Sequence, residues 1–189
     1  MSNMVYQLAR HPEWQTRLRA QSQALCESKG TSTLDYDDLA SVTDIERVMK
    51  EALRLCAPVP YMPRKLTRTI EFEGYQLPAG SFVSVSPWVS HYLSDYWDEP
   101  YRFDPERFGP ERAEHKQHPF LWAPFGGGAH KCIGLHFGEM EIKAIMHQLL
   151  LRFRWSVPAD YEMQQDFTSL PIPKDHLPVK LDVLPARPI

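Results

Sequence analysis

The ten residues FGGGAHKCIG, from Phe125 to Gly134, constrain the fold of this 189-residue chain more than any other stretch. Three glycines stand in a row, and a fourth follows shortly after the single cysteine of the stretch, Cys132. Glycine loses more conformational entropy on folding than any other residue, so such a run indicates unusual backbone angles or a close approach. A long helical pattern begins directly after the stretch. The sequence therefore predicts a tight loop that presents one thiol at a helix N-terminus.

Two phosphate-binding motifs do not fit this loop. A P-loop needs Gly-Lys followed by Ser or Thr, whereas Lys131 is preceded by His130 and followed by Cys132. A dinucleotide-binding fingerprint needs a further glycine three residues after Gly128, and that position is Lys131. The sequence therefore disfavours a nucleotide as the ligand of the loop.

A zinc site is a further alternative, because His and Cys are the common zinc ligands. His130, Cys132 and His136 are close in sequence. A structural zinc site needs a second ligand pair at a matching spacing, and the downstream His147 and His176 do not form one. Zinc is therefore a weaker interpretation than a cofactor that needs a single thiolate.

The chemistry around Cys132 suits haem. The N–H groups and the dipole of a helix N-terminus stabilise a thiolate, and glycines let a flat group approach the backbone. His130 and Lys131 add donors and positive charge beside the sulfur, where a haem propionate needs them. The plain alternative is a buried, inert cysteine, but that leaves the flanking glycines unexplained.

Composition limits the kinds of partner and the cellular location that we expect for this chain. The formal net charge of −3 and the isoelectric point near 6.2 argue against nucleic acid or an anionic membrane as the main partner. Three widely spaced cysteines are not a disulfide framework, which favours a reducing, cytoplasmic location. No apolar run is long enough for a transmembrane helix, and the first residues do not resemble a signal peptide.

Hydrophobic periodicity predicts most of the helices. We expect helix over residues 1–28 with a break at Pro12, over 36–40, over 45–56, over 88–93 and over 135–153. Thr43 and Glu46 have the spacing of a capping box at the start of the third of these helices. On the last helix, the apolar face is expected at Gly138, Ile142, Ile145, Leu149 and Phe153.

Short strands are expected elsewhere, over residues 67–72, 75–77, 81–86 and 179–184. Leu77 to Gly80 reads as a turn with Pro78 at its second position. The proline-rich stretch 98–112 reads as an ordered meander. One domain, or part of one, is the simplest organisation.

Glu51 and Arg54 lie three residues apart on one helical face. On spacing alone, such a pair is a local surface ion pair that stabilises a helix by about 0.2–0.5 kcal/mol.

Three motifs, in the right order, resemble the cytochrome P450 family. Residues 125–134 match its haem-binding signature F-x-x-G-x-x-x-C-x-G, residues 51–54 its E-x-x-R motif, and residues 105–108 its P-E-R-F element. The resemblance implies that Glu51, Arg54 and Arg107 form one buried network, which contradicts the surface pair expected from spacing. It also implies a fold that is mainly α with small β-sheets. Residues 1–189 then form a single partial domain, and the family's N-terminal part with its oxygen-activating helix is expected outside this chain.

The resemblance also implies roles for individual residues. Cys132 is the expected iron ligand, and Gly138 is expected in a closely packed position. The other expected haem-binding residues are Phe125, Gly128, His130, Gly134 and Arg64. The expected substrate-pocket residues are Val59, Pro60, Tyr61, Met62, Thr168, Ser169 and Leu170. No catalytic acid or base is expected within this chain.

The implied activity is insertion of one oxygen atom of O2 into a small hydrophobic substrate such as a sterol, terpenoid, retinoid or fatty acid. Haem b (iron protoporphyrin IX) is the implied cofactor. Electrons from NAD(P)H are expected through a ferredoxin or a flavoprotein reductase. The alternative is a truncated, non-catalytic fragment that at most binds haem.

Overall fold

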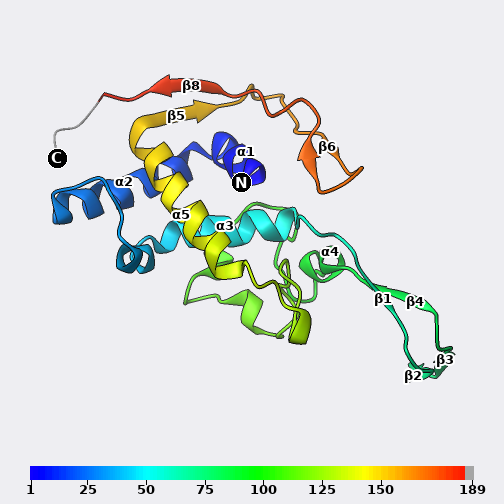
Figure 1. Ribbon diagram of the computed structural model, residues 1–189. Helices are drawn as coiled ribbons and strands as arrows, with labels where there is room; N and C mark the ends of the chain where they lie inside the picture. The colour runs from blue at the N-terminus through cyan, green and yellow to red at the C-terminus, as the bar shows by residue number, and fades with distance from the viewer. Residues whose placement is uncertain (186–189) are drawn as a thin grey trace.

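The computed structural model describes residues 1–185, and its centre is a group of crossing helices (Figure 1). The helices are α1 (Ser2–Arg10), α2 (Pro12–Lys29), α3 (Thr43–Leu55), α4 (Pro87–His91) and α5 (Leu135–Arg152), with short 3₁₀ turns η1 (Tyr36–Ala40), η2 (Pro105–Phe108), η3 (Glu114–Lys116) and η4 (Gly128–His130). The strands are β1 (Met62–Lys65), β2 (Ile70–Phe72), β3 (Tyr75–Leu77), β4 (Phe82–Val85), β5 (Phe153–Ser156), β6 (Gln165–Asp166), β7 (Ile172–Pro173) and β8 (Lys180–Val183). The prediction of a mainly α fold with small sheets is confirmed.

The break between the first two helices falls at Pro12, as predicted. Pro12 is the first residue of α2, a position where its missing N–H costs nothing. At the other end of α2, Gly30 adopts left-handed φ and ψ of 67° and 22°, and its N–H donates to the carbonyl of Cys26 at 2.8 Å. Local signals therefore set both ends of this helix.

The predicted capping box at the start of α3 is wrong. Thr43 is already the first helical residue, and its side chain does not cap the helix. The side chain of Gln21 in α2 partly caps α3 instead, because the N–H of Asp44 donates to Gln21 Oε1 at 3.2 Å. The carboxylate of Glu46 instead accepts from Lys50 at 2.6 Å and from Lys143 at 2.7 Å. Tertiary partners therefore replaced a local cap.

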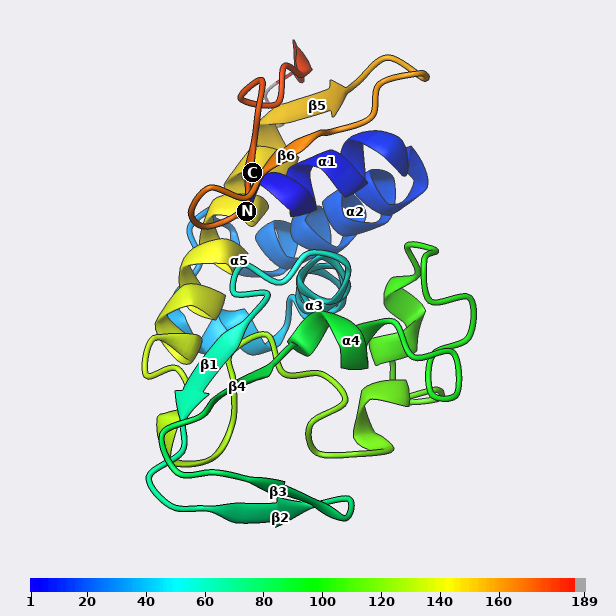
Figure 2. The same cartoon turned by 90° about the vertical axis from the view of Figure 1, so that its right-hand side faces the viewer.

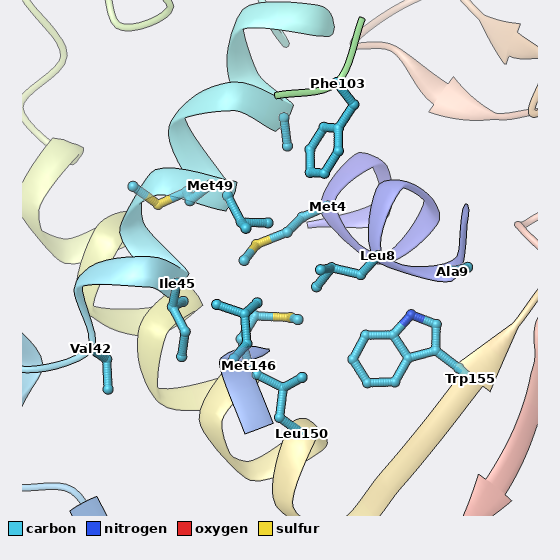
Figure 3. Close-up of a cluster of buried hydrophobic side chains, with 13 residues drawn as sticks. Met4, Leu8, Ala9, Val42, Ile45, Met49, Phe103, Met146, Leu150 and Trp155 are labelled. Atoms are coloured by element: carbon cyan, nitrogen blue, oxygen red, sulfur yellow. The ribbon is translucent and has the colours of Figure 1, made fainter. Parts of the chain in front are cut away.

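The main hydrophobic core lies where α1, α3, α5 and β5 meet (Figure 3). Leu8, Ile45, Met146 and Leu150 are fully buried there, and Trp155 of β5 packs beside them. The Trp155 Nε1–H donates to the carbonyl of Val5 at 2.9 Å, which satisfies its polar atom. Truncating one of these large aliphatic side chains to Ala is expected to cost about 2–5 kcal/mol.

Buried polar side chains of α2 tie the start of the chain to its end. Gln15 Nε2 donates to the carbonyls of Leu8 and Trp155 at 3.1 and 3.0 Å. Arg19 donates from Nε to the carbonyl of Leu150 and from Nη2 to the carbonyl of Phe153, both at 2.8 Å. These carbonyls lie at the end of α5, where a helix has no acceptor partners of its own. Arg19 therefore caps α5 from a distant part of the chain.

The predicted apolar face of α5 is correct in part, because Ile142, Leu149 and Phe153 are half-buried and pack against the core, but the fully buried stripe lies beside them. The buried residues are Lys143, Met146, His147 and Leu150, whereas Ile145 is 38% exposed. The buried stripe contains polar side chains with tertiary partners. Lys143 Nζ donates to the carbonyl of Leu39 at 3.2 Å in addition to Glu46, and His147 Nε2 bonds the carbonyl of Ser32 at 3.2 Å. Periodicity of apolar residues alone does not identify such a stripe.

The strands form two-stranded antiparallel pairs at the edge of the helical core (Figure 2). The pairs are β1 with β4, β2 with β3, β5 with β8 and β6 with β7. Strands β2 and β3 were both expected from sequence, and they form a hairpin with Glu73 and Gly74 at positive φ of 49° and 79° in its two-residue turn. Among the described residues, no helix combines the length and apolar character that a membrane span requires.

Two details of the strands differ from the sequence prediction. Strand β1 was not expected, because it contains Pro63 and exposes three of its four residues. The turn before β4 is closed by the N–H of Ser81 and the carbonyl of Pro78 at 3.2 Å, so Pro78 is its first residue and not its second. Gly80 provides the positive φ of 87° that this turn needs.

Candidate functional site

Residues 125–134, called the thiol loop below, form a closed turn in front of α5. The N–H of Cys132 donates to the carbonyl of Phe125 at 2.9 Å, and the N–H of Gly126 donates to the carbonyl of Ala123 at 3.0 Å. Gly134 is the N-cap residue of α5, as expected for a thiol placed just before a helix N-terminus. Backbone hydrogen bonds therefore hold the start of the loop in place.

Glycine occupies the three consecutive positions 126–128 for different physical reasons. Gly126 and Gly128 adopt positive φ of 70° and 64°, which L-residues rarely adopt. At Gly127, a Cβ atom would lie 2.4 Å from a ring carbon of Phe120, so a side chain there would force that ring to move. At Gly128, a Cβ atom would meet nothing within 4 Å. One side of the loop is packed and the other faces open space.

The open side presents Cys132 as an exposed thiol. His130 and Lys131 beside it are exposed as well, and the apolar Ile133 and Phe137 have exposed fractions of 101% and 65%. In residues 1–185, no three His, Cys, Asp or Glu side chains gather to hold a metal ion. The donor set is one soft sulfur atom beside apolar surface and basic side chains, which fits the iron and propionates of a haem.

Strand β1 lies next to the thiol loop and brings Arg64 to the same part of the molecule. The Sδ atom of Met62 lies 3.3 Å from where a Cβ of Gly126 would be. Arg64, two residues further, is exposed, and its Nη1 donates to the carbonyl of Pro63 at 2.9 Å. Close packing predicted at Gly138 is not seen, because a Cβ there would meet nothing within 4 Å.

Glu51, Arg54 and Arg107, called the ionic cluster below, are all buried. Arg54 donates to the Glu51 carboxylate from Nε at 2.6 Å and from Nη2 at 2.8 Å, and Arg107 Nε donates to it at 3.3 Å. The surface pair expected from spacing alone is therefore wrong, since Glu51 and Arg54 have exposed side-chain fractions of 0%.

Both arginines use all of their N–H groups. Besides Glu51, Arg54 donates to the carbonyls of His91, Pro100 and Arg102 at 2.8, 2.7 and 3.2 Å. Besides Glu51, the acceptors of Arg107 are the Glu114 carboxylate and the carbonyls of Asp98, Glu99 and Arg102. An arginine has five N–H donors, and each of these two has five acceptors. When every N–H of a buried arginine is hydrogen-bonded, these bonds offset the free-energy cost of removing its charge from water.

Sequence reasoning missed His91, which is fully buried at the end of α4. Its ring contacts the carbonyl of Arg54 through Nδ1 at 3.0 Å and the N–H of Ala123 through Nε2 at 3.1 Å. Burial lowers the pKa of His91 to about 4, and the nearby Arg54 adds to this effect. A lone histidine in a short, mixed segment gives no sequence signal for such a position.

The two segments expected to line a substrate pocket, residues 59–62 and 168–170, both lie close to α4. Ser86 Oγ donates to the carbonyl of Pro60 at 2.9 Å, and Trp88 contacts Phe167 edge-on with ring centroids 5.4 Å apart. Tyr61 and Leu170 have exposed fractions of 64% and 58%. Val59 is also exposed, as are Thr168 and Ser169. The two segments therefore offer apolar side chains to solvent in the same part of the molecule.

A cavity of about 130 Å³ lies between α1, α3 and the tail, and the predicted substrate-pocket residues do not line it. Its lining includes Cys56, Pro58, Gln165 and Pro171, which flank those segments in sequence. The Cys56 thiol and the Gln165 side chain are in contact, with Sγ 2.9 Å from Nε2.

Comparison with known proteins gives a consistent result. The family model described as cytochrome P450 matches residues 1–181. A putative cytochrome P450 136 of Mycobacterium tuberculosis is 43% identical over 95% of this chain and 36% of its own length. A taurochenodeoxycholic 6 alpha-hydroxylase of Sus scrofa is 38% identical over 92% of this chain and 32% of its own length.

Among solved structures, a retinoic acid bound cyanobacterial CYP120A1 superposes with a TM-score of 0.89 at 32% identity. That match covers 97% of this chain and 41% of the other. The chain therefore spans about a third of the curated relatives it matches and somewhat more of this structure.

Proposed function

This chain belongs to the cytochrome P450 family, and we propose that its thiol loop binds haem b through the Cys132 thiolate as part of a monooxygenase. The exposed thiol of Cys132 supports this proposal most strongly, because a lone cysteine is usually buried. When bound, the haem supplies oxygen activation, and a thiolate ligand favours O–O bond cleavage in this family. The residues of the chain hold, orient and shield the cofactor.

Each predicted haem-binding residue has a specific part in this proposal. Phe125 fixes the position of Cys132 through their backbone hydrogen bond. Gly128 leaves its outer side free for a flat ring, and Gly134 starts the helix that stabilises the thiolate. His130 and Arg64 are exposed donors for the two propionates.

We propose a small hydrophobic substrate of the sterol, terpenoid, retinoid or fatty acid type. The exposed Val59, Tyr61 and Leu170 support this class, because they offer apolar surface beside the proposed cofactor. The names of two similar proteins, a taurochenodeoxycholic acid hydroxylase and a structure with bound retinoic acid, agree with it. Pro60, Met62, Thr168 and Ser169 complete the proposed lining. Electrons are proposed to come from NAD(P)H through a ferredoxin or a flavoprotein reductase.

Haem titration of the reduced chain tests the ligand. The carbon monoxide complex of the wild type is expected to show the long-wavelength Soret band of haem-thiolate proteins, and Cys132→Ala to lack it. Cys56→Ala is the matched control, because it removes a half-buried thiol elsewhere and should keep the band. A band that survives in Cys132→Ala, or is absent in the wild type, contradicts the proposal.

Two further measurements divide the proposal into parts. Arg64→Gln should weaken haem binding several-fold, whereas Arg68→Gln, exposed in the same segment, should not. The alternative of a non-catalytic fragment that binds haem is tested with the loaded chain, a reductase and NADPH. Consumption of NADPH without oxidised product in the presence of fatty acid or retinoid favours that alternative.

A further inference from the structure

His91 connects two parts of the molecule that are far apart in sequence. It ends α4 and is fully buried, and its two ring nitrogens reach backbone groups of different segments. Nδ1 lies 3.0 Å from the carbonyl of Arg54, at the end of α3. Nε2 lies 3.1 Å from the backbone nitrogen of Ala123, just before the thiol loop.

These two partners determine the proton positions on the ring. A carbonyl oxygen only accepts, so Nδ1 must carry the proton that is donated to Arg54. A backbone N–H only donates, so Nε2 must be the bare, accepting nitrogen that faces Ala123. His91 is therefore neutral with its proton on Nδ1, and neither the other tautomer nor the protonated ring makes both bonds.

On one side, His91 is joined firmly to the ionic cluster. Arg54 Nη1 donates to the carbonyl of His91 at 2.8 Å while the His91 ring donates to the carbonyl of Arg54. The two residues thus exchange a pair of hydrogen bonds in a buried environment. Because Arg54 is also held by both oxygens of Glu51, its backbone and guanidinium give His91 a rigid support.

On the other side, backbone hydrogen bonds connect His91 with the backbone of Cys132. Ala123 donates to His91, and its own carbonyl accepts from the N–H of Gly126 at 3.0 Å. Phe125, between these two, accepts from the N–H of Cys132 at 2.9 Å. The start of the thiol loop is therefore anchored by the ring of His91.

We propose that His91 is a positioning residue that transfers the rigidity of the ionic cluster to the thiol loop and so fixes the place of Cys132. The hydrogen bonds from Arg54 through His91 to Ala123 are called the bridge below. The consequence for haem rests on the proposed function above, whereas the bridge does not. His91 does not touch the thiol and acts only through Ala123 and the loop backbone.

Two conservative variants separate the two bonds. The Nδ2 of an asparagine occupies the place of Nδ1, so His91→Asn keeps a donor for Arg54 and loses the acceptor for Ala123. The Oε1 of a glutamine reaches the place of Nε2, so His91→Gln keeps the acceptor for Ala123. Tyr92→Phe is the matched control, because Tyr92 donates to the carbonyl of Leu55 at 2.6 Å, at the same helix end, without reaching the loop.

Amide hydrogen exchange of the 189-residue chain, without haem, reads the bridge directly. In His91→Asn, the amides of Ala123, Gly126 and Cys132 are expected to exchange about 10- to 100-fold faster than in the wild type. In His91→Gln and Tyr92→Phe, they should stay within about threefold of wild type. Amides of the β5–β8 pair serve as the internal reference for global unfolding.

Two results would overturn the proposal. One is an unchanged loop in His91→Asn, or equal acceleration of loop and β5–β8 amides. The other is a nitrogen NMR spectrum of the wild type in which the neutral ring of His91 carries its proton on Nε2. Both measurements remain informative if a variant is less stable, because exchange is compared within one molecule and the spectrum needs no variant.

Haem titration of the same variants tests the consequence for Cys132. The share of the long-wavelength Soret band in the reduced carbon monoxide complex should fall at least twofold in His91→Asn and be restored in His91→Gln. If the wild type shows no such band, the proposed function fails while the exchange data still decide the bridge. A normal band in His91→Asn overturns the consequence for Cys132.

Discussion

In the ionic cluster, Glu51 and Arg54 expose none of their side chains, whereas Cys132, His130 and Lys131 of the thiol loop are exposed. The cluster satisfies every arginine N–H with a protein acceptor. The loop is held by a few backbone hydrogen bonds and by the contact of Phe125 with Trp122, and its side chains from Ala129 to Ile133 are exposed. The difference indicates that the cluster supports the fold, while the loop keeps its polar side chains accessible, as the proposed haem site requires.

The largest effect on stability is expected in the cluster. Glu51→Gln keeps the shape but removes the carboxylate that the two buried arginines share, which should cost about 3–5 kcal/mol of unfolding free energy. Urea unfolding measures this. Glu99→Gln is the control, because Glu99 and Arg102 form an exposed pair that is worth less than about 1 kcal/mol. Equal losses in both variants would remove the distinction between cluster and surface.

Acid should weaken the connection between the two regions. The pKa of His91 is about 4 in the folded chain and 6.5 in the unfolded chain, so only the unfolded chain takes up this proton between these values. The contribution of His91 to the unfolding free energy is therefore fully present well above pH 6.5 and falls by on the order of 3 kcal/mol towards pH 4. Burial also lowers the pKa values of His115 and His147, so these two histidines add to the loss in acid.

The charged groups near the His91 ring are Arg54 and, behind it, Glu51 and Arg107. Urea unfolding at a series of pH values should show a smaller loss in His91→Gln than in the wild type. An identical pH dependence in the two proteins would assign the acid effect to other groups.

In the thiol loop, we expect backbone strain to be the main effect of substitutions on the unfolding free energy. Gly128→Ala places a Cβ at φ 64° with no contact nearby, and should cost roughly 1–2 kcal/mol. Gly138→Ala, equally free of contacts but inside α5, should gain up to about 1 kcal/mol. Thermal unfolding of the two variants measures both signs. A stabilising Gly128→Ala would mean that the loop does not need its left-handed residue.

The smallest effect on stability is expected at the thiol itself. Cys132→Ala should change the unfolding free energy of the haem-free chain by less than about 0.5 kcal/mol, because the side chain is exposed. Cys26→Ala, which removes a buried sulfur 3.7 Å from His147 Nε2, should cost more. A large loss in Cys132→Ala would mean that the thiol serves the fold, contrary to the comparison above.

The local features of this fold were predictable from sequence. Pro12 and Gly30 set helix ends, and Glu73-Gly74 set the hairpin, through backbone preferences that a single residue carries. Features that depend on distant partners were not. The buried face of α5 contains Lys143 and His147. These two side chains can be buried because Glu46 and the carbonyl of Ser32 form hydrogen bonds with them.

The candidate site divides in the same way. The thiol loop was predicted from its glycines and its one cysteine, since both are local. Spacing alone misplaced Glu51 and Arg54 on the surface, because the carbonyls that surround Arg54 come from residues about 40 positions away. His91 was missed for the same reason, since its role depends on two backbone groups that the chain brings together only on folding.

Gln15 and Arg19 have a consequence for the order of synthesis. Gln15 bonds the carbonyl of Trp155, 140 positions further along the chain, and Arg19 bonds that of Leu150, 131 positions further. A ribosome that adds about 5–20 residues per second takes roughly 7 to 28 s to supply those acceptors. Until then, Gln15 has its partner Leu8 but not Trp155, and Arg19 lacks both carbonyls at the end of α5. The nascent helix pair α1–α2 therefore lacks part of its native hydrogen bonding until β5 has been synthesised.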